Sequence, residues 1–207
     1  MADPVNPPGA PSARGRDARA RLLDAAVQAF AARGFHGTTT RDIASAAGMS
    51  PAALYVHYGS KEELLHEISL AGHRTALGIC EQAVAASEQP AEQLRVLVRD
   101  FVRHHAANNT VARIVNYELG ALAPEHRAEI DGLRHAMDVL VRDLVRRGVR
   151  DGEFDTPEPA VTGAALLSLG IDVSRWYAAG GWSPDQVADH YAELALRMVG
   201  ASGSSPG

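Results

Sequence analysis

The side chains between residues 39 and 61 suit contact with a nucleic acid better than they suit catalysis. Small or ring-bearing polar residues recur there, at Ser50, Tyr55 and His57, and Lys61 closes the segment. Hydroxyl and imidazole groups can bind phosphates or base edges, and short side chains allow close approach to a duplex. The chemistry that this stretch predicts is therefore non-covalent recognition of DNA.

Two short helices joined by a tight turn would position these side chains. Thr39 or Thr40 can cap the first helix, which would end at Gly48. Ser50 can cap the second helix, whose Leu54 would face back onto the first across small alanines, as a helix-turn-helix requires. The residues left on the outer face are Ser50, Ala52, Ala53, Tyr55 and His57.

A third helix is predicted to begin after Ser60, with Glu63 completing a capping box. Lys61 falls in its first turn, where a cation is unfavourable to the helix dipole. A charge in this position needs a partner, and we expect a DNA phosphate to supply it.

The net charge of −5 becomes compatible with DNA binding once it is divided along the chain. Residues 12–61 hold seven basic and three acidic residues, a balance of +4, and the remainder holds 13 basic and 22 acidic residues, a balance of −9. A positive DNA-binding part on an acidic body would supply a salt-sensitive attraction for phosphates. Arginine on helix surfaces is also ordinary, so the charge division is supporting evidence only.

The segment closely resembles the N-terminal signature of the TetR family of transcriptional repressors. The matching residues, which include part of the preceding helix, are Phe30, Gly34, Phe35, Thr39, Thr40, Ile43, Ala44, Ala47, Gly48, Leu54, Tyr55, His57, Tyr58, Ser60, Lys61, Glu62 and Leu64. The resemblance implies an operator-binding repressor in which Tyr55, His57 and Lys61 bind phosphates. It places Arg41, Ser50, Ala52 and Ala53 where bases are read. Thr39, Thr40 and Tyr58 complete the predicted DNA-binding set. The family usually has Phe at the position of Tyr58.

The rest of the chain reads as helices, and no alternating strand pattern occurs. Helices are predicted at 17–33, 60–86, 90–107, 111–122, 124–148, 157–178 and 183–199, which with the central pair gives an all-α fold of about nine helices. We predict a disordered arm at 1–15, a DNA-binding domain at 16–62, an effector-binding and dimerisation domain at 63–200, and a disordered tail at 201–207. Arg14 and Arg16 could bring the arm to DNA, or the arm could simply be solvated.

The last two predicted helices, about 157–178 and 183–199, are apolar on more than one side. Such helices need a covering surface, and a second copy of the chain would supply it as a four-helix bundle. The family resemblance implies the same homodimer, which would bind a palindromic operator. Thr156 and Pro157 are predicted to start the first of the two helices.

A small-molecule effector is implied by the same resemblance. The block 174–187 is loosely similar to regulators that respond to acyl-CoA thioesters, and we favour that effector class. Polar and aromatic residues on otherwise apolar helices could line its pocket, although each also fits a structural role. They are His105, Asn109, Arg113, Asn116, Tyr117, Asp172, Arg175 and Trp176.

Other chemistry has little support in the sequence. No histidine pair at i, i+4 accompanies a carboxylate, no Gly-rich phosphate loop or nucleophile elbow occurs, and Cys80 is the single cysteine. We therefore expect no catalytic residue, metal or cofactor. A helical-bundle enzyme and a non-regulatory architectural DNA-binding protein remain alternatives. No run of 18 apolar residues and no hydrophobic signal region occur, so we expect a soluble cytoplasmic protein without a membrane partner.

Overall fold

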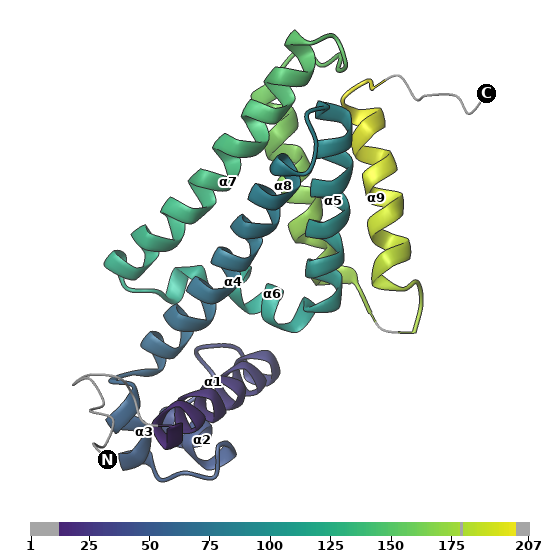
Figure 1. The fold of residues 1–207 in the computed structure, drawn as a ribbon. Helices are drawn as coiled ribbons and strands as arrows, with labels where there is room; N and C mark the ends of the chain where they lie inside the picture. The colour runs from purple at the N-terminus through teal and green to yellow at the C-terminus, as the bar shows by residue number, and fades with distance from the viewer. Residues whose placement is uncertain (1–12, 179, 202–207) are drawn as a thin grey trace, which may run out of the picture. The chain divides into compact units, whose positions relative to one another are not determined.

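The computed structural model describes residues 13–178 and 180–201. Within these ranges it contains nine α-helices, one short 3-10 helix and no strand (Figure 1). The elements are α1 (Ala13–Arg33), α2 (Thr40–Ala46), α3 (Pro51–His57), α4 (Lys61–Ala85), α5 (Pro90–Ala107), α6 (Asn109–Tyr117), η1 (Leu119–Ala121), α7 (Pro124–Arg150), α8 (Pro159–Trp176) and α9 (Pro184–Met198). The predicted all-α fold is confirmed.

The described residues form two compact units, and the division falls between Leu65 and His66, inside α4. In the first unit α1 packs on α2, and α2 packs on α3. Its fully buried side chains include Leu22, Ile43 and Leu54, one from each of these helices. Apolar residues on facing helices thus supply the core that holds the helix pair α2–α3.

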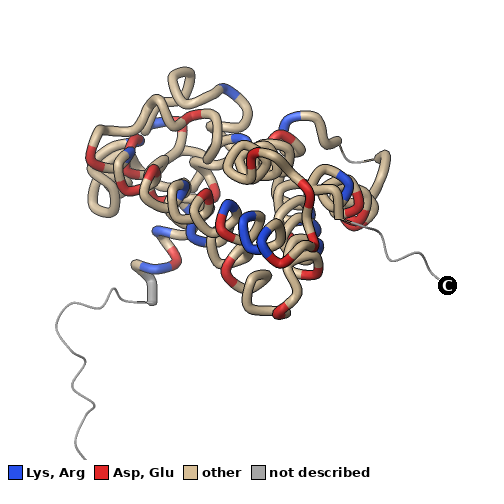
Figure 2. The backbone as a smooth tube through the Cα atoms, turned by 90° about the horizontal axis from the view of Figure 1, so that it is seen from above, with Lys and Arg blue, Asp and Glu red and all other residues tan. Residues whose placement is uncertain are grey.

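In the second unit α5 lies beside α9 and α8, and α7 packs along α8 (Figure 1). Acidic and basic residues both recur throughout the described part of the chain (Figure 2). Three arginines of α5 face three acidic residues of α9, as in the pair Arg99–Asp189 at 2.8 Å. These pairs join α5 to α9 along their facing sides.

Several predicted boundaries need correction. Residues 13–15 belong to α1, so their predicted disorder is wrong, whereas most of the predicted arm and tail lies outside the described residues. Helix α8 begins at Pro159 rather than Pro157. The Thr156 hydroxyl instead hydrogen bonds to that of Thr162 at 2.7 Å.

The predicted cap of α4 is confirmed at Ser60, whose hydroxyl accepts a hydrogen bond from the N–H of Glu63 at 3.1 Å. The predicted capping box is wrong in one detail. The Glu63 carboxylate accepts its hydrogen bond from the N–H of Gly59, at 2.8 Å, rather than from that of Ser60. Two hydrogen bonds, one to Ser60 and one to Glu63, therefore still fix the start of α4.

Candidate functional site

Local hydrogen bonds fix where α2 and α3 begin. The Thr39 hydroxyl accepts a hydrogen bond from the N–H of Asp42 at 3.2 Å, and the Thr39 N–H donates to the Asp42 carboxylate at 2.9 Å. Hydrogen bonds from the Thr39 hydroxyl and N–H lower the pKa of Asp42. The Ser50 hydroxyl accepts from the N–H of Ala53 at 3.1 Å. Between the helices Gly48 has a φ of +67°, which favours glycine because other side chains are strained there.

The outer face of α3 is small and weakly polar. Leu54 is fully buried, while Ala52, Tyr55 and Val56 are exposed. The exposed fraction of Val56, 79%, was not anticipated by the sequence analysis. It could have been, because Val56 lies two residues from buried Leu54 and therefore on the opposite side of the helix.

The predicted outward residues are mostly accessible. Ser50 is exposed, Ala53 and His57 are half-buried, and Arg41 is exposed on α2. The hydroxyl groups of Tyr55 and Thr40 lie 3.1 Å apart and link α3 to the first residue of α2. Most of the predicted DNA-binding side chains therefore lie on α2, on α3 or at the caps of these two adjacent helices.

Tyr58 is different, because only 3% of it is exposed. Its ring packs in the core, with the Arg19 guanidinium 4.5 Å from the ring centroid. The prediction that Tyr58 contacts DNA is therefore wrong. Arg19 also donates to the carbonyl of His57 at 3.2 Å, and Arg21 donates to that of Ala47. Both cations bind the C-terminal ends of helices, where positive charge is favourable.

Lys61 has partners within the chain, contrary to expectation. Its ammonium donates to the carbonyls of Phe35 at 2.7 Å and Thr38 at 2.8 Å, and it lies 4.2 Å from the centroid of the Phe35 ring. These bonds tie the start of α4 to the loop that leads into α2. A phosphate contact by Lys61 stays a prediction, but the reason first given for it is wrong.

The predicted effector residues fall into separate places in the second unit. His105 is 3% exposed, and its Nδ1–H donates to the carbonyl of Phe101 at 2.8 Å. Burial lowers the pKa of His105 to about 4. A neutral, buried imidazole in α5 is thus part of the interior.

Asn116 belongs to a partly buried polar network that joins α4, α6 and α7. Arg134 donates to the Asn116 side-chain oxygen at 3.2 Å and to Nε2 of His73 at 3.4 Å. Because Nε2 accepts, Nδ1 carries the proton and donates to the carbonyl of Ser69 at 2.8 Å. Burial lowers the pKa of His73. The hydroxyl of Ser69 is buried without a hydrogen-bond partner among the described residues.

Sequence reasoning missed His73 and Arg134, although a signal existed. Ser69 and His73 are polar residues four positions apart on the inner stripe of α4, which continues to Ala76 and Cys80. Polar residues in a buried stripe need internal partners. They could therefore have been recognised as an interior network.

Tyr117, Asp172 and Arg175 form a third group, at the surface. The Tyr117 hydroxyl donates to the Asp172 carboxylate at 3.4 Å, and Arg175 lies 3.5 Å from the same carboxylate. Arg113 is exposed on α6. These side chains are exposed, whereas His105 is buried in α5.

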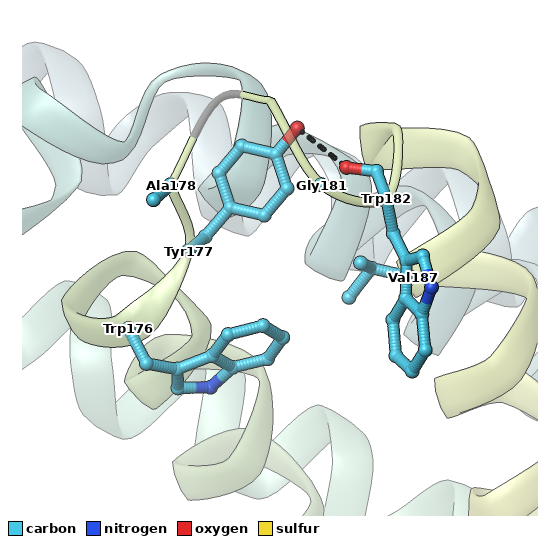
Figure 3. A pocket seen from close by; sticks show the side chains of 6 residues that line it. All are labelled: Trp176, Tyr177, Ala178, Gly181, Trp182 and Val187. Atoms are coloured by element: carbon cyan, nitrogen blue, oxygen red, sulfur yellow. Dashed lines mark hydrogen bonds between the residues drawn. The ribbon is translucent and has the colours of Figure 1, made fainter.

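A cavity of about 350 Å³ lies where α8 leads into α9 (Figure 3). The Tyr177 hydroxyl donates to the Trp182 carbonyl at 3.1 Å across it, and Asn109 donates to the Tyr177 carbonyl at 2.9 Å. Only Trp176 among the predicted effector residues lines this cavity. The described residues that line it are Trp176, Tyr177, Ala178, Gly181, Trp182 and Val187. Trp182 was missed, although both tryptophans of the chain lie within seven residues.

Two family models match this chain. Residues 22–68 match the bacterial regulatory proteins, tetR family, and residues 87–199, more than half of the chain, match the tetracyclin repressor-like, C-terminal domain. The chain belongs to the TetR family. The predicted family is therefore confirmed, and TetR proteins are transcription regulators rather than enzymes.

Individual TetR proteins resemble the chain over most of its length. The HTH-type transcriptional repressor KstR2 of Rhodococcus jostii (strain RHA1) is 31% identical over 196 residues, covering 93% of this chain and 96% of that protein. A tetR-family regulatory protein from Rhodococcus RHA1 has a TM-score of 0.85 at 41% identity, covering 89% and 98% of the two chains. AibR, which was solved with isovaleryl coenzyme A and operator DNA, has a TM-score of 0.78 and is 24% identical, and the match covers 86% of this chain and 97% of that chain. At this identity the likeness shows only that the two chains share a fold.

The described residues of this TetR-family chain contain no group of three or more metal-ligating side chains placed to hold an ion. None of their helices is both long and apolar enough to span a bilayer.

Replacing Lys61 with methionine should destabilise the first unit of this TetR-family chain by about 2 kcal/mol, because two carbonyls lose a charged donor. Urea unfolding followed by circular dichroism, with hydrogen exchange over residues 34–40, would measure the loss. Arg41→Met is the matched control, since it removes one positive charge from an exposed position. Wild-type stability in Lys61→Met, together with a flatter salt dependence of DNA binding, would show that the ammonium serves a phosphate instead.

Proposed function

We propose that this chain is a ligand-responsive repressor that binds a palindromic operator as a homodimer. The observation that carries the proposal is the outer face of α3, held by capped helices and a buried Leu54, with Ala52, Tyr55 and Val56 exposed. A helix with short outer side chains fits a major groove. The residues proposed to contact DNA are Thr39, Thr40, Arg41, Ser50, Ala52, Ala53, Tyr55, His57 and Lys61.

The proposed homodimer forms through α8 and α9. Val161, Leu169 and Trp176 recur at spacings of eight and seven residues on α8, with exposed fractions of 66%, 43% and 46%. On α9, Tyr191 stacks on Trp176 at 6.3 Å between ring centroids, and Met198 is 40% exposed one heptad later. Exposed apolar stripes on adjacent helices support an interface between copies.

The proposed effector is a small hydrophobic compound or an acyl-CoA thioester bound in the second unit. The two tryptophans at the cavity offer faces on which a planar ring can stack, and Arg175 offers a charge for an acidic group. AibR, which shares the fold, was solved with a coenzyme A thioester. The surface group at Asp172 and the network at Asn116 are further proposed contacts.

In this proposal residues 16–62 form the DNA-binding domain, and residues 63–200 form the domain that binds the effector and dimerises. Helix α4 is continuous from Lys61 to Ala85 and has residues in both compact units. A continuous helix can carry a small displacement from one end to the other. Effector would release DNA by favouring a dimer in which the two α3 helices no longer match the operator spacing.

Selection from a pool of random duplexes tests the DNA-binding part of the proposal. The full chain should enrich a palindrome, with an affinity that falls steeply as salt rises because phosphate contacts release counterions. If the chain binds duplexes but enriches no particular sequence, it is an architectural DNA-binding protein. If it binds no duplex at low salt, any DNA-binding role is contradicted.

The enriched duplex then tests the effector. Fluorescence anisotropy should show release of the duplex by isovaleryl coenzyme A or a longer acyl-CoA, but not by coenzyme A alone. Trp182→Ala, which changes the cavity outside the exposed apolar stripes of α8 and α9, should weaken the response to the thioester without changing the affinity for DNA in its absence. The thioester class would be excluded if coenzyme A alone released the duplex as well as the acyl-CoA compounds do. It would also be excluded if none of these compounds released the duplex.

A further inference from the structure

Helix α3 lacks the side chains that usually distinguish bases by paired hydrogen bonds. Bidentate recognition of guanine or adenine in the major groove requires Arg, Lys, Asn or Gln. The seven residues of α3 are Pro51, Ala52, Ala53, Leu54, Tyr55, Val56 and His57. Sequence recognition by this helix must therefore rest largely on contacts of another kind.

The most accessible large apolar side chain in the described part of the chain lies on this helix. Val56 is 79% exposed, against 66% for Val161 and 63% for Trp182. Its position opposite Leu54 and Tyr58, both buried, directs its isopropyl group away from the core. Ala52 lies one turn earlier on the same side and is also exposed. Together Val56 and Ala52 form a small apolar surface, which we name the α3 methyl face.

The polar neighbours of this face are engaged elsewhere or lie at its edge. The hydroxyl of Tyr55 is 3.1 Å from that of Thr40, which holds the phenol toward the start of α2. The carbonyl of His57 is bound by Arg19, and the His57 side chain is half-buried. The centre of the outer face is thus apolar.

Among groups presented in the major groove, the C5-methyl group of thymine is the one that matches an apolar side chain. We infer that Val56 determines operator specificity by packing against a thymine methyl group in each half-site. The inference rests on the proposed function, because it assumes that α3 enters the major groove. It assigns to this valine a role in base selection rather than in folding.

Deoxyuridine substitution tests the contact directly, because uracil differs from thymine only by the missing methyl group. The duplex enriched by the full chain is resynthesised with each thymine in turn replaced by deoxyuridine. One position per half-site should weaken binding of the wild-type chain by about fourfold, the effect of losing one buried methyl group, and both together by about 15-fold. The remaining thymines serve as internal controls.

Variants of Val56 identify the side chain responsible. Val56→Ala should fold normally, since the side chain is exposed, and should bind the thymine and deoxyuridine duplexes with nearly equal affinity. Val56→Ile should keep the discrimination. A Val56→Ala variant that still discriminates in full, or a wild-type chain indifferent to every deoxyuridine, would overturn the inference while leaving the proposed function intact. Failure to enrich any duplex would overturn both.

Discussion

Replacing Leu169 with glutamate should convert the chain to a monomer and lower its affinity for operator DNA by at least about 100-fold. Leu169 lies at the centre of the apolar stripe of α8, between Val161 and Trp176. In a two-fold interface each substitution is introduced twice, so two carboxylates would face an apolar surface. Burying an unpaired charge costs several kcal/mol, which exceeds what a modest interface can absorb. Loss of the dimer removes the second half-site contact.

Sedimentation velocity and fluorescence anisotropy with the enriched duplex would measure the two effects. The matched control is Ala128→Glu, which places the same charge on an exposed position of α7 outside the two stripes. Circular dichroism should show an unchanged helix content in both variants, because Leu169 is 43% exposed in the single chain. A Leu169→Glu protein that remains a dimer would place the interface elsewhere.

The features of the fold that could be predicted from sequence are local ones. The caps at Thr39 and Ser50 involve partners three residues away, and the turn at Gly48 requires one backbone conformation. A short motif contains all the atoms that form such features. The starts of α5 at Pro90 and of α7 at Pro124 were predictable for the same reason.

The errors concern partners that are distant in sequence. Lys61 binds carbonyls 23 and 26 residues away, and Arg19 binds one 38 residues away. A charge on a predicted helix surface gives no indication that such a carbonyl lies beside it. The basic residues of the first unit were therefore counted as an attraction for DNA phosphates, although Lys61, Arg19 and Arg21 each bind backbone carbonyls within that unit.

The predicted effector residues show the same limit. Periodicity identifies polar residues on apolar helices, but it does not show which of them share a cavity. His105 lies in the interior, Asn116 is half-buried, Tyr117 and Asp172 lie at the surface, and only Trp176 lines the cavity near α9. The distinction depends on the packing of several helices and could not be derived from one helix at a time.

Lowering the pH from 6.5 to 4 should remove about 3 kcal/mol of stability through His105 alone. Burial lowers its pKa in the folded chain to about 4, from an ordinary value of 6.5. The unfolded chain therefore binds a proton first as the pH falls. The contribution of His105 is fully present above pH 6.5, declines between pH 6.5 and 4, and changes no further below the folded pKa. His104 and His73 disfavour its charged form as well.

Urea unfolding at several pH values, for the wild-type chain and His105→Gln, isolates this contribution. The variant should be less stable at pH 7, because a packed ring and its bond to the Phe101 carbonyl are lost, but the difference should shrink or reverse toward pH 4.5. His135→Gln, at an exposed position of α7, should follow the wild-type curve. Because His73 is present in both chains, parallel curves for the wild type and His105→Gln would mean that His105 does not remain neutral in the folded state. The buried imidazole would then need a partner for its charge.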